Sequence, residues 1–345
     1  MKLRDLGRVR QVFRRVRNSI APGALILMYH RIADEDSDPW GLCVKPQHFA
    51  KHLEVLRKMV RPLQLHQLTQ EMDAGTRLHR SVALTFDDGY IDNLQNAKPL
   101  LERFDLPATV FVSTGYTGQD REFWWDELER LFLQPRQLPE TLQLKIEGQH
   151  YQWELGTDAH YSQEAFARDR LWQAEHQKTP SVRHSLYYSI WRLLQPLREE
   201  VRRQLLDELL TWADAKPQAR ATHRPLTQAE VLDLERESPI EVGAHTVMHP
   251  FLSALPISSQ KQEIQQSKTH LEEILGHPVR SFAYPYGDYT KDTIAVVREA
   301  GFTCACSTNK GSVKRQSDRF QLPRVGVKDW DGDEFARRLA RWFDV

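Results

Sequence analysis

The stretch of sequence that decides the fold is Val82-Ala83-Leu84-Thr85-Phe86-Asp87-Asp88-Gly89-Tyr90. It combines a short apolar run, two adjacent carboxylates and a glycine. The apolar run predicts a buried strand, and Gly89 permits a sharp turn directly after it. In parallel α/β sheets, ligands bind beyond the carboxyl ends of the strands. The stretch therefore predicts a parallel sheet whose end presents Asp87 and Asp88 to one site.

Six further apolar runs on either side of this stretch predict strands, and helical patterns alternate with them. The runs are Leu25–Met28, Pro62–Leu65, Ala108–Ser113, Ile240–Gly243, Ser281–Tyr284 and Phe302–Cys306. The predicted helices include His48–Met59, Asn93–Phe104, Ser259–Leu275 and Thr290–Ala300, and the third of them begins with a Ser259/Gln262 capping box. This alternation predicts an α/β fold with a parallel sheet, closed into a barrel or a partly open barrel.

Residues 124–226 break the alternation and predict a mostly helical insertion between two barrel strands. Leu142–Glu147 and His150–Leu155 predict a hairpin, and Tyr187–Leu194 and Val201–Trp212 predict helices. Thr227 and Glu230 predict a capped helix that leads back to the sheet. The insertion, which starts with two tryptophans, could cover the site or be a separately packed subdomain.

The composition narrows the class of protein. The chain has 345 residues with 47 basic and 47 acidic side chains, so it lacks the positive field of a dedicated nucleic-acid binder. Its three cysteines include no CxxC pair, which argues against a disulfide framework and a cysteine zinc cage. A reduced, cytoplasmic setting is expected.

The pattern of residues 1–20 predicts a basic amphipathic helix. The barrel, with its insertion, is expected to span residues 21–345. Such a helix can contact anionic lipid or a partner, or pack on the protein itself. The apolar run at 21–29 does not resemble a signal peptide, because it lacks a small-residue cleavage site. We therefore expect a cytoplasmic protein, in which this helix either packs on the protein's own surface or makes a peripheral contact with the inner face of the membrane.

A second pair of polar side chains follows the predicted strand at 240–243. His245 and His249 are four residues apart, a spacing that places two imidazoles on one face of a helical turn, where they can share a metal. A metal would also relieve the repulsion between Asp87 and Asp88, with one carboxylate as ligand and the other free as a base. Neutral imidazole suits zinc, cobalt, nickel or iron.

Two further segments lie at predicted strand ends. The loop Tyr284-Pro285-Tyr286-Gly287 can offer backbone N–H groups to an oxyanion and aromatic faces to a sugar. His30 ends the first strand and is either a general acid or a structural histidine.

Together these segments resemble the polysaccharide deacetylase family, whose catalytic unit is the NodB homology domain of carbohydrate esterase family 4. Thr85–Gly89 matches its Thr-Phe-Asp-Asp-Gly motif, and His245–Pro250 matches its His-Ser/Thr-x-x-His-Pro motif. The resemblance spans most of the chain outside the insertion. It implies a distorted (β/α)7 barrel, a divalent metal and removal of acetyl groups from carbohydrate.

The resemblance also implies roles for single residues. The metal ligands would be Asp88, His245 and His249, the general base Asp87, and the oxyanion donor the backbone N–H of Tyr286. The Met-Tyr-His-Arg segment resembles a subgroup, the exopolysaccharide deacetylases, in which the strand with the general acid comes first. That places His30 in the role of the acid.

One position departs from the family pattern. The third motif usually has an arginine, which orients the base, where this chain has Ala283. Arg280 and Arg324 are the two candidates for that role, and we expect both near the substrate together with Tyr284 and Pro285.

The function expected from the resemblance is a metal-dependent N-deacetylase, with Zn²⁺ preferred over Co²⁺, Ni²⁺ and Fe²⁺. Its partner would be an acetylated amino-sugar glycan or a glycan precursor, in pathways such as exopolysaccharide biosynthesis. Three alternatives stay open: a carbohydrate O-acetyl esterase, a non-catalytic glycan-binding barrel, and a non-haem iron oxygenase, whose site also uses two histidines and one carboxylate.

Overall fold

The computed structural model describes residues 23–76 and 78–343. The helix predicted over residues 1–20 lies outside this part of the chain, so its contact with a membrane stays a prediction. Among the helices of the described ranges, none combines the length and the apolarity that crossing a bilayer would require.

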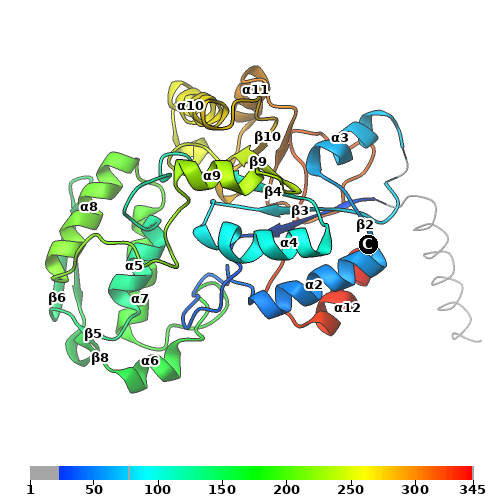
Figure 1. The fold of residues 1–345 in the computed structure, drawn as a ribbon. Coiled ribbons are helices and arrows are strands. Elements are labelled where there is room, and N and C mark those ends of the chain that lie inside the picture. Colours follow the sequence, from blue (N-terminus) through cyan, green and yellow to red (C-terminus); the bar gives the residue numbers. More distant parts are fainter. Residues whose placement is uncertain (1–22, 77, 344–345) are drawn as a thin grey trace, which may run out of the picture.

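A curled sheet of parallel strands forms the centre of the molecule, as predicted (Figure 1). The strands run in the order β11-β10-β9-β4-β3-β1-β12, and short β2 pairs with β3. Their bounds are β1 Leu25–Tyr29, β2 Arg61–Pro62, β3 Ser81–Phe86, β4 Ala108–Val112, β9 Ile240–Ala244, β10 Ser281–Ala283, β11 Cys304–Cys306 and β12 Val325–Gly326. The fold is therefore the expected distorted, partly open α/β barrel. It is not the antiparallel jelly roll on which the oxygenase alternative depends.

Helices cover the outside of this sheet (Figure 1). They are α2 Pro46–Met59, α3 Leu65–Asp73, α4 Lys98–Phe104, α9 Gln228–Glu235, α10 Ile257–Leu275, α11 Lys291–Glu299 and α12 Gly332–Phe343.

Alternate residues of a strand face opposite sides of the sheet. Val82, Leu84 and Phe86 of β3 pack in the large core cluster, whereas Ala83 belongs to a smaller cluster with Phe111. Because Asp87 continues the alternation of Ala83 and Thr85, it is expected on the same side as these two residues.

Three local predictions are corrected by the structure, and one strand was missed. The helix α10 begins at Ile257 behind Pro256, so the Ser259/Gln262 capping box is not its start. Of the strand predicted at 62–65, only the first residue pairs with β3, and Leu65 opens α3. The helix predicted at 93–104 is divided, with a π-helical turn over Asn93–Ala97 before α4. Pro99 in the first turn of α4 explains this break, because it has no N–H to continue the earlier helix. Strand β12 has only two residues and was not predicted.

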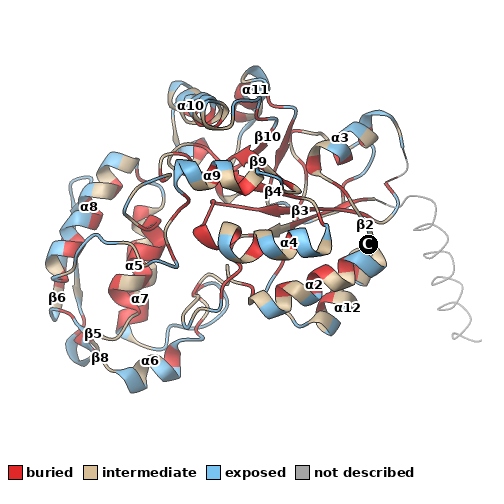
Figure 2. Cartoon of the chain, in the orientation of Figure 1, coloured by how far each residue is buried: buried red, intermediate tan, exposed pale blue. Residues whose placement is uncertain are grey.

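The insertion packs around a core of its own. It contains α5 Trp124–Phe132, β5 Arg136–Gln137, β6 Thr141–Ile146, β7 Gln149–Glu154, β8 His160–Tyr161, α6 Gln163–Asp169, α7 Val182–Leu194 and α8 Glu199–Trp212. The predicted hairpin is the antiparallel pair β6–β7. Many residues of α5 and α7 are buried (red in Figure 2), and they belong to a cluster separate from that of the sheet. The Thr227/Glu230 box caps α9 as predicted.

Candidate active site

The turn after β3 directs two carboxylates into one site. Asp87 donates its backbone N–H to the Tyr29 carbonyl at 3.0 Å, which extends the pairing of β1 and β3 by one residue. Asp88 and Gly89 then both take left-handed backbone conformations, with φ of 77° and 84°. This conformation is costly for a side chain such as Asp88. It breaks the strand alternation, so Asp87 and Asp88 both line the same cavity.

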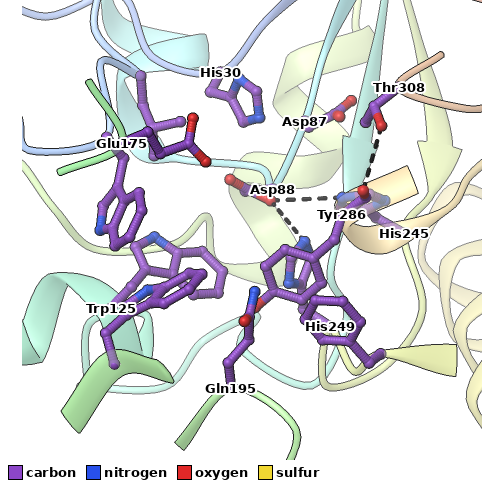
Figure 3. Close-up of a pocket in the computed structure, with 14 residues that line it drawn as sticks. His30, Asp87, Asp88, Trp125, Glu175, Gln195, His245, His249, Tyr286 and Thr308 are labelled. Atoms are coloured by element: carbon purple, nitrogen blue, oxygen red, sulfur yellow. Dashed lines mark hydrogen bonds and ion pairs between the residues drawn. The ribbon is translucent and has the colours of Figure 1, made fainter. Parts of the chain in front are cut away.

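The two histidines come from a loop after β9, not from the helical turn that their spacing predicted. Thr246 and His249 have positive φ values of 64° and 52°, which no α-helix allows. The Thr246 hydroxyl accepts the His249 N–H at 3.0 Å. The Glu263 carboxylate of α10 accepts the N–H groups of Val247 and Met248 at 2.9 and 2.8 Å. These bonds hold both imidazoles toward Asp88 (Figure 3).

Asp88, His245 and His249 form a buried group of three metal-ligating side chains whose ligand atoms lie within 4.8 Å of one another. The Asp88 Oδ1 atom is 3.6 Å from His245 Nε2 and 3.4 Å from His249 Nε2. His245 is oriented through its Nδ1, which is 2.7 Å from the Ala283 carbonyl oxygen. His249 is packed between the rings of Trp125 and Tyr286, at 5.0 and 4.5 Å.

The electrostatics of this group fit a divalent cation. Burial, together with the charges of Asp87 and Asp126, raises the pKa of Asp88 well above its usual range. Burial also lowers the pKa of His245 and of His249, which keeps both imidazoles neutral as metal ligands require. One carboxylate oxygen and two imidazole nitrogens are the donor set of many zinc sites with an open coordination position. A cation would offset the cost of an ionised, buried Asp88.

Asp87 is held by Arg324. Of the two candidates, Arg324 is therefore the arginine that orients this carboxylate. The guanidinium donates to Asp87 Oδ1 at 2.6 Å and to Oδ2 at 2.7 Å, and it also donates to the Ser307 carbonyl at 2.9 Å. Burial raises the pKa of Asp87, but the charge of Arg324 and its hydrogen bonds outweigh this effect and lower the pKa to about 2. Asp87 is therefore an ionised carboxylate at neutral pH.

Arg280 lies elsewhere, and the prediction that it contacts the substrate or Asp87 is wrong. It is exposed and directly precedes β10, at the end of this parallel strand remote from the site. Tyr284 and Pro285 are also absent from the cavity wall. The Tyr284 ring packs in the core, and its hydroxyl donates to the Phe320 carbonyl at 2.9 Å.

Two other predicted residues do line the cavity. His30 follows β1 and faces the site from the side of Asp87 (Figure 3). Burial lowers the pKa of His30 to about 4, although the negative charge of Asp87 acts to raise it. The imidazole is therefore neutral at pH 7. Tyr286 has a left-handed backbone with φ of 57°, and its ring stacks on Phe251 at 4.3 Å.

The cavity has a volume of about 370 Å³, within the range of small-molecule sites. Several of its lining residues were not predicted: Trp40, Leu42, Glu175, Trp191, Gln195, Phe251 and Thr308. Three of these belong to the insertion, and Trp125 of the insertion lines the cavity as well. The insertion therefore covers the site in addition to having its own core.

Comparison with known proteins places the chain in a family. The polysaccharide deacetylase profile matches residues 74–165 and 212–305, more than half of the chain, and the segment it skips lies inside the insertion. A Bacillus subtilis (strain 168) protein named as a polysaccharide deacetylase, YxkH, is 35% identical over 307 residues, which cover 88% of this chain and 70% of the relative. A Staphylococcus aureus poly-beta-1,6-N-acetyl-D-glucosamine N-deacetylase is 26% identical over 81 residues, covering 24% of this chain and 27% of the relative.

Solved structures share the fold. The Streptococcus pyogenes deacetylase PplD, in complex with acetate, has a TM-score of 0.57 at 17% identity, covering 92% of this chain and 99% of that chain. IcaB from Ammonifex degensii has a TM-score of 0.55 at 20% identity, with coverage of 94% and 98%. The profile match, the Bacillus relative and the geometry of the site agree: this chain belongs to the polysaccharide deacetylase family.

Proposed function

We propose that the protein is a metal-dependent hydrolase that removes acetyl groups from the amino groups of an N-acetylated amino-sugar glycan or glycan precursor. The observation that carries the proposal is the convergence of Asp88, His245 and His249 beside an ionised Asp87 in one cavity. The Staphylococcus relative, named as an N-deacetylase of an N-acetylglucosamine polymer, supports the choice of nitrogen over oxygen.

The three buried side chains would hold a divalent cation, with Zn²⁺ preferred because its usual ligands include two histidines and a carboxylate. Such a cation supplies two things when bound: it polarises the acetyl carbonyl and lowers the pKa of a bound water. Co²⁺, Ni²⁺ and Fe²⁺ suit the same donors.

Asp87 takes the role of the general base. The two bonds from Arg324 fix the plane of its carboxylate and keep it ionised. A carboxylate with a pKa of about 2 is a weak base. It can accept a proton efficiently only from a strongly acidified water, which makes the base and the metal site interdependent.

His30 takes the role of the general acid. Hydrolysis moves one proton from the attacking water to the departing nitrogen, so the proton that Asp87 accepts balances the one that His30 donates. Because His30 is neutral at pH 7, the proton that Asp87 takes from the water is passed on through His30 to the departing nitrogen, after which both side chains are back in their starting forms. The backbone N–H of Tyr286 is the proposed donor to the oxyanion, since this residue lines the cavity beside His249.

The test is a screen of acetylated sugars for acetate release, with the metal content measured on the same preparation. We expect acetate from N-acetylated amino-sugar oligomers, loss of activity with a chelator, and recovery with Zn²⁺ or Co²⁺. Acetate from O-acetylated sugars alone would identify an esterase. Tight binding of glycan without any acetate release would identify a non-catalytic barrel. Either result would overturn the proposal.

A further inference from the structure

The cavity has two chemically different walls. One carries the metal-ligating group with Asp87 and His30. The other combines the indole rings of Trp40, Trp125 and Trp191 with the carboxylate of Glu175. In Figure 3 the Glu175 carboxylate is directed into the cavity. The reaction proposed above uses none of these four side chains, which we call the indole–Glu175 wall.

The Glu175 end of this wall is held in place by hydrogen bonds between the insertion and the loop after β1. Ala174 donates its backbone N–H to the Pro39 carbonyl at 2.8 Å, and the Gln173 amide donates to the Asp38 carbonyl at 2.8 Å. An ion pair of 2.8 Å joins Arg170 to Asp36 on the same side. The Glu175 side chain is exposed, and these bonds anchor the backbone that carries it.

The indoles are fixed as well. The Trp40 Nε1–H donates to the Tyr187 hydroxyl at 2.6 Å, and the Trp40 ring packs on Trp191 at 4.2 Å. Trp125 donates its Nε1–H to the Tyr90 hydroxyl at 2.7 Å. The three rings are therefore in place before any ligand binds, and the backbone that carries Glu175 is anchored beside them.

The charges in the cavity leave Glu175 available to a ligand. Asp87 is paired with Arg324, and Asp88 faces the two histidines. Within residues 23–76 and 78–343, no Lys, Arg or His side chain forms an ion pair with Glu175. Lys328, a nearby cation, donates to the Gly41 carbonyl at 2.9 Å.

A carboxylate beside several indole rings is suited to an organic cation. Indole faces attract ammonium groups, most strongly where water is partly excluded, and the carboxylate adds a Coulombic attraction. The apolar faces of the same rings also suit the apolar face of a sugar. A neutral acetamido sugar would use the rings but not the charge.

We propose that the indole–Glu175 wall binds the ammonium group of a deacetylated amino sugar that neighbours the acetylated sugar in the reaction. The inference rests on the proposed function, because it takes the ligand to be a glycan. It narrows the substrate class to partially deacetylated chains. Each acetyl group removed creates an amine, so the product of one turnover becomes a better ligand for the next.

The test measures binding to chelator-treated protein by quenching of tryptophan fluorescence. The two probes are a fully acetylated glucosamine tetramer and the same tetramer with one internal free amine. At about pH 6.5, where an amine with a pKa near 8 is charged, we expect roughly fivefold tighter binding of the amine-bearing tetramer. The preference should vanish at about pH 9.5.

The variant E175Q keeps the shape of the side chain and removes its charge. We expect it to bind the fully acetylated tetramer as the wild type does and to lose the preference. E208Q, which removes an exposed carboxylate from α8 of the same insertion, is the matched control and should retain it. Equal affinities for the two probes in the wild type, no binding of either, or a preference that survives E175Q would each overturn the inference.

Acetate release by metal-loaded protein separates this result from the proposed function. Release of acetate from both tetramers, without a difference in binding, contradicts only the proposal that the indole–Glu175 wall binds an ammonium group. Absence of release from both contradicts the deacetylase itself, whatever the binding shows.

Discussion

The barrel and the insertion contribute to the same cavity in different ways. The barrel supplies the reactive side chains, and most of them follow directly from the carboxyl ends of strands: His30 after β1, Asp87 and Asp88 after β3, His245 after β9. The insertion supplies Trp125, Glu175, Trp191 and Gln195 from helices and loops packed around a separate core. The sheet therefore carries the side chains proposed for the chemistry, and the insertion carries side chains proposed to contact the substrate. Substitutions in the barrel should therefore lower turnover, whereas substitutions in the insertion should mainly change substrate binding.

The largest effect is expected from Asp87→Asn in the barrel. The amide cannot accept the proton from water, so we expect turnover to fall by about 100- to 10,000-fold. Metal content should stay at the wild-type level, because Asp87 is not among the proposed ligands. Steady-state acetate release and metal analysis of one preparation check both points. Near-native turnover would remove Asp87 from the role of base.

A smaller effect is expected from Arg324→Lys. Lysine keeps the positive charge but cannot form the paired bonds of 2.6 and 2.7 Å to the two carboxylate oxygens. We expect the pKa of Asp87 to rise from about 2, because the charged form loses part of its stabilisation. The acid limb of the pH–rate profile should move to higher pH, and turnover should fall about tenfold. An unchanged acid limb would contradict the coupling of Arg324 to the base.

In the insertion, Trp125→Phe should change substrate binding more than turnover. Phenylalanine keeps an aromatic ring in the cavity wall but loses the bond to the Tyr90 hydroxyl. We expect KM to rise about three- to tenfold with kcat and metal content nearly unchanged. The control is Trp153→Phe in the hairpin, which is not part of the cavity wall. A large loss of kcat would mean that the insertion takes part in the chemistry.

The smallest effect concerns stability and tests whether the insertion core is acid-sensitive. Burial lowers the pKa of His184 to about 4, compared with about 6.5 for an unfolded histidine. Between these two values the unfolded chain binds more protons, so the free energy of unfolding should fall as pH falls from about 6.5 toward 4. His184→Gln should flatten this dependence in urea titrations at several pH values, whereas exposed His150→Gln should leave it unchanged. Equal slopes for the wild type and His184→Gln would contradict the assignment.

The sequence allowed the parallel fold and most of the barrel side of the site to be predicted, because those residues lie in short motifs next to apolar strands. Asp88 and Gly89 show the limit of such motifs, since the left-handed turn at Asp88 is a backbone property that no pattern of side chains displays. The helical turn predicted for His245 and His249 was wrong for a reason visible in the sequence. Pro250 follows His249, and the residue before a proline avoids the α conformation.

Other parts of the site depend on tertiary contacts between distant segments. Arg324 reaches Asp87 from 237 residues away along the chain, and only the packing of the barrel interior selects it over Arg280. Glu175 and Trp40 meet because the insertion docks on the loop after β1 through backbone groups such as Ala174 N–H and Pro39 C=O. Backbone contacts of this kind leave no pattern in the sequence.

The measurement that tests the central claim most directly is the metal stoichiometry of the wild-type chain and of Asp88→Ala and His245→Ala, determined by mass spectrometry after dialysis against Zn²⁺. We predict one tightly held ion per wild-type chain and none in either variant, with folding of the variants verified by circular dichroism. A folded wild-type chain that retains no ion, or an Asp88→Ala chain that still holds one, would contradict the account.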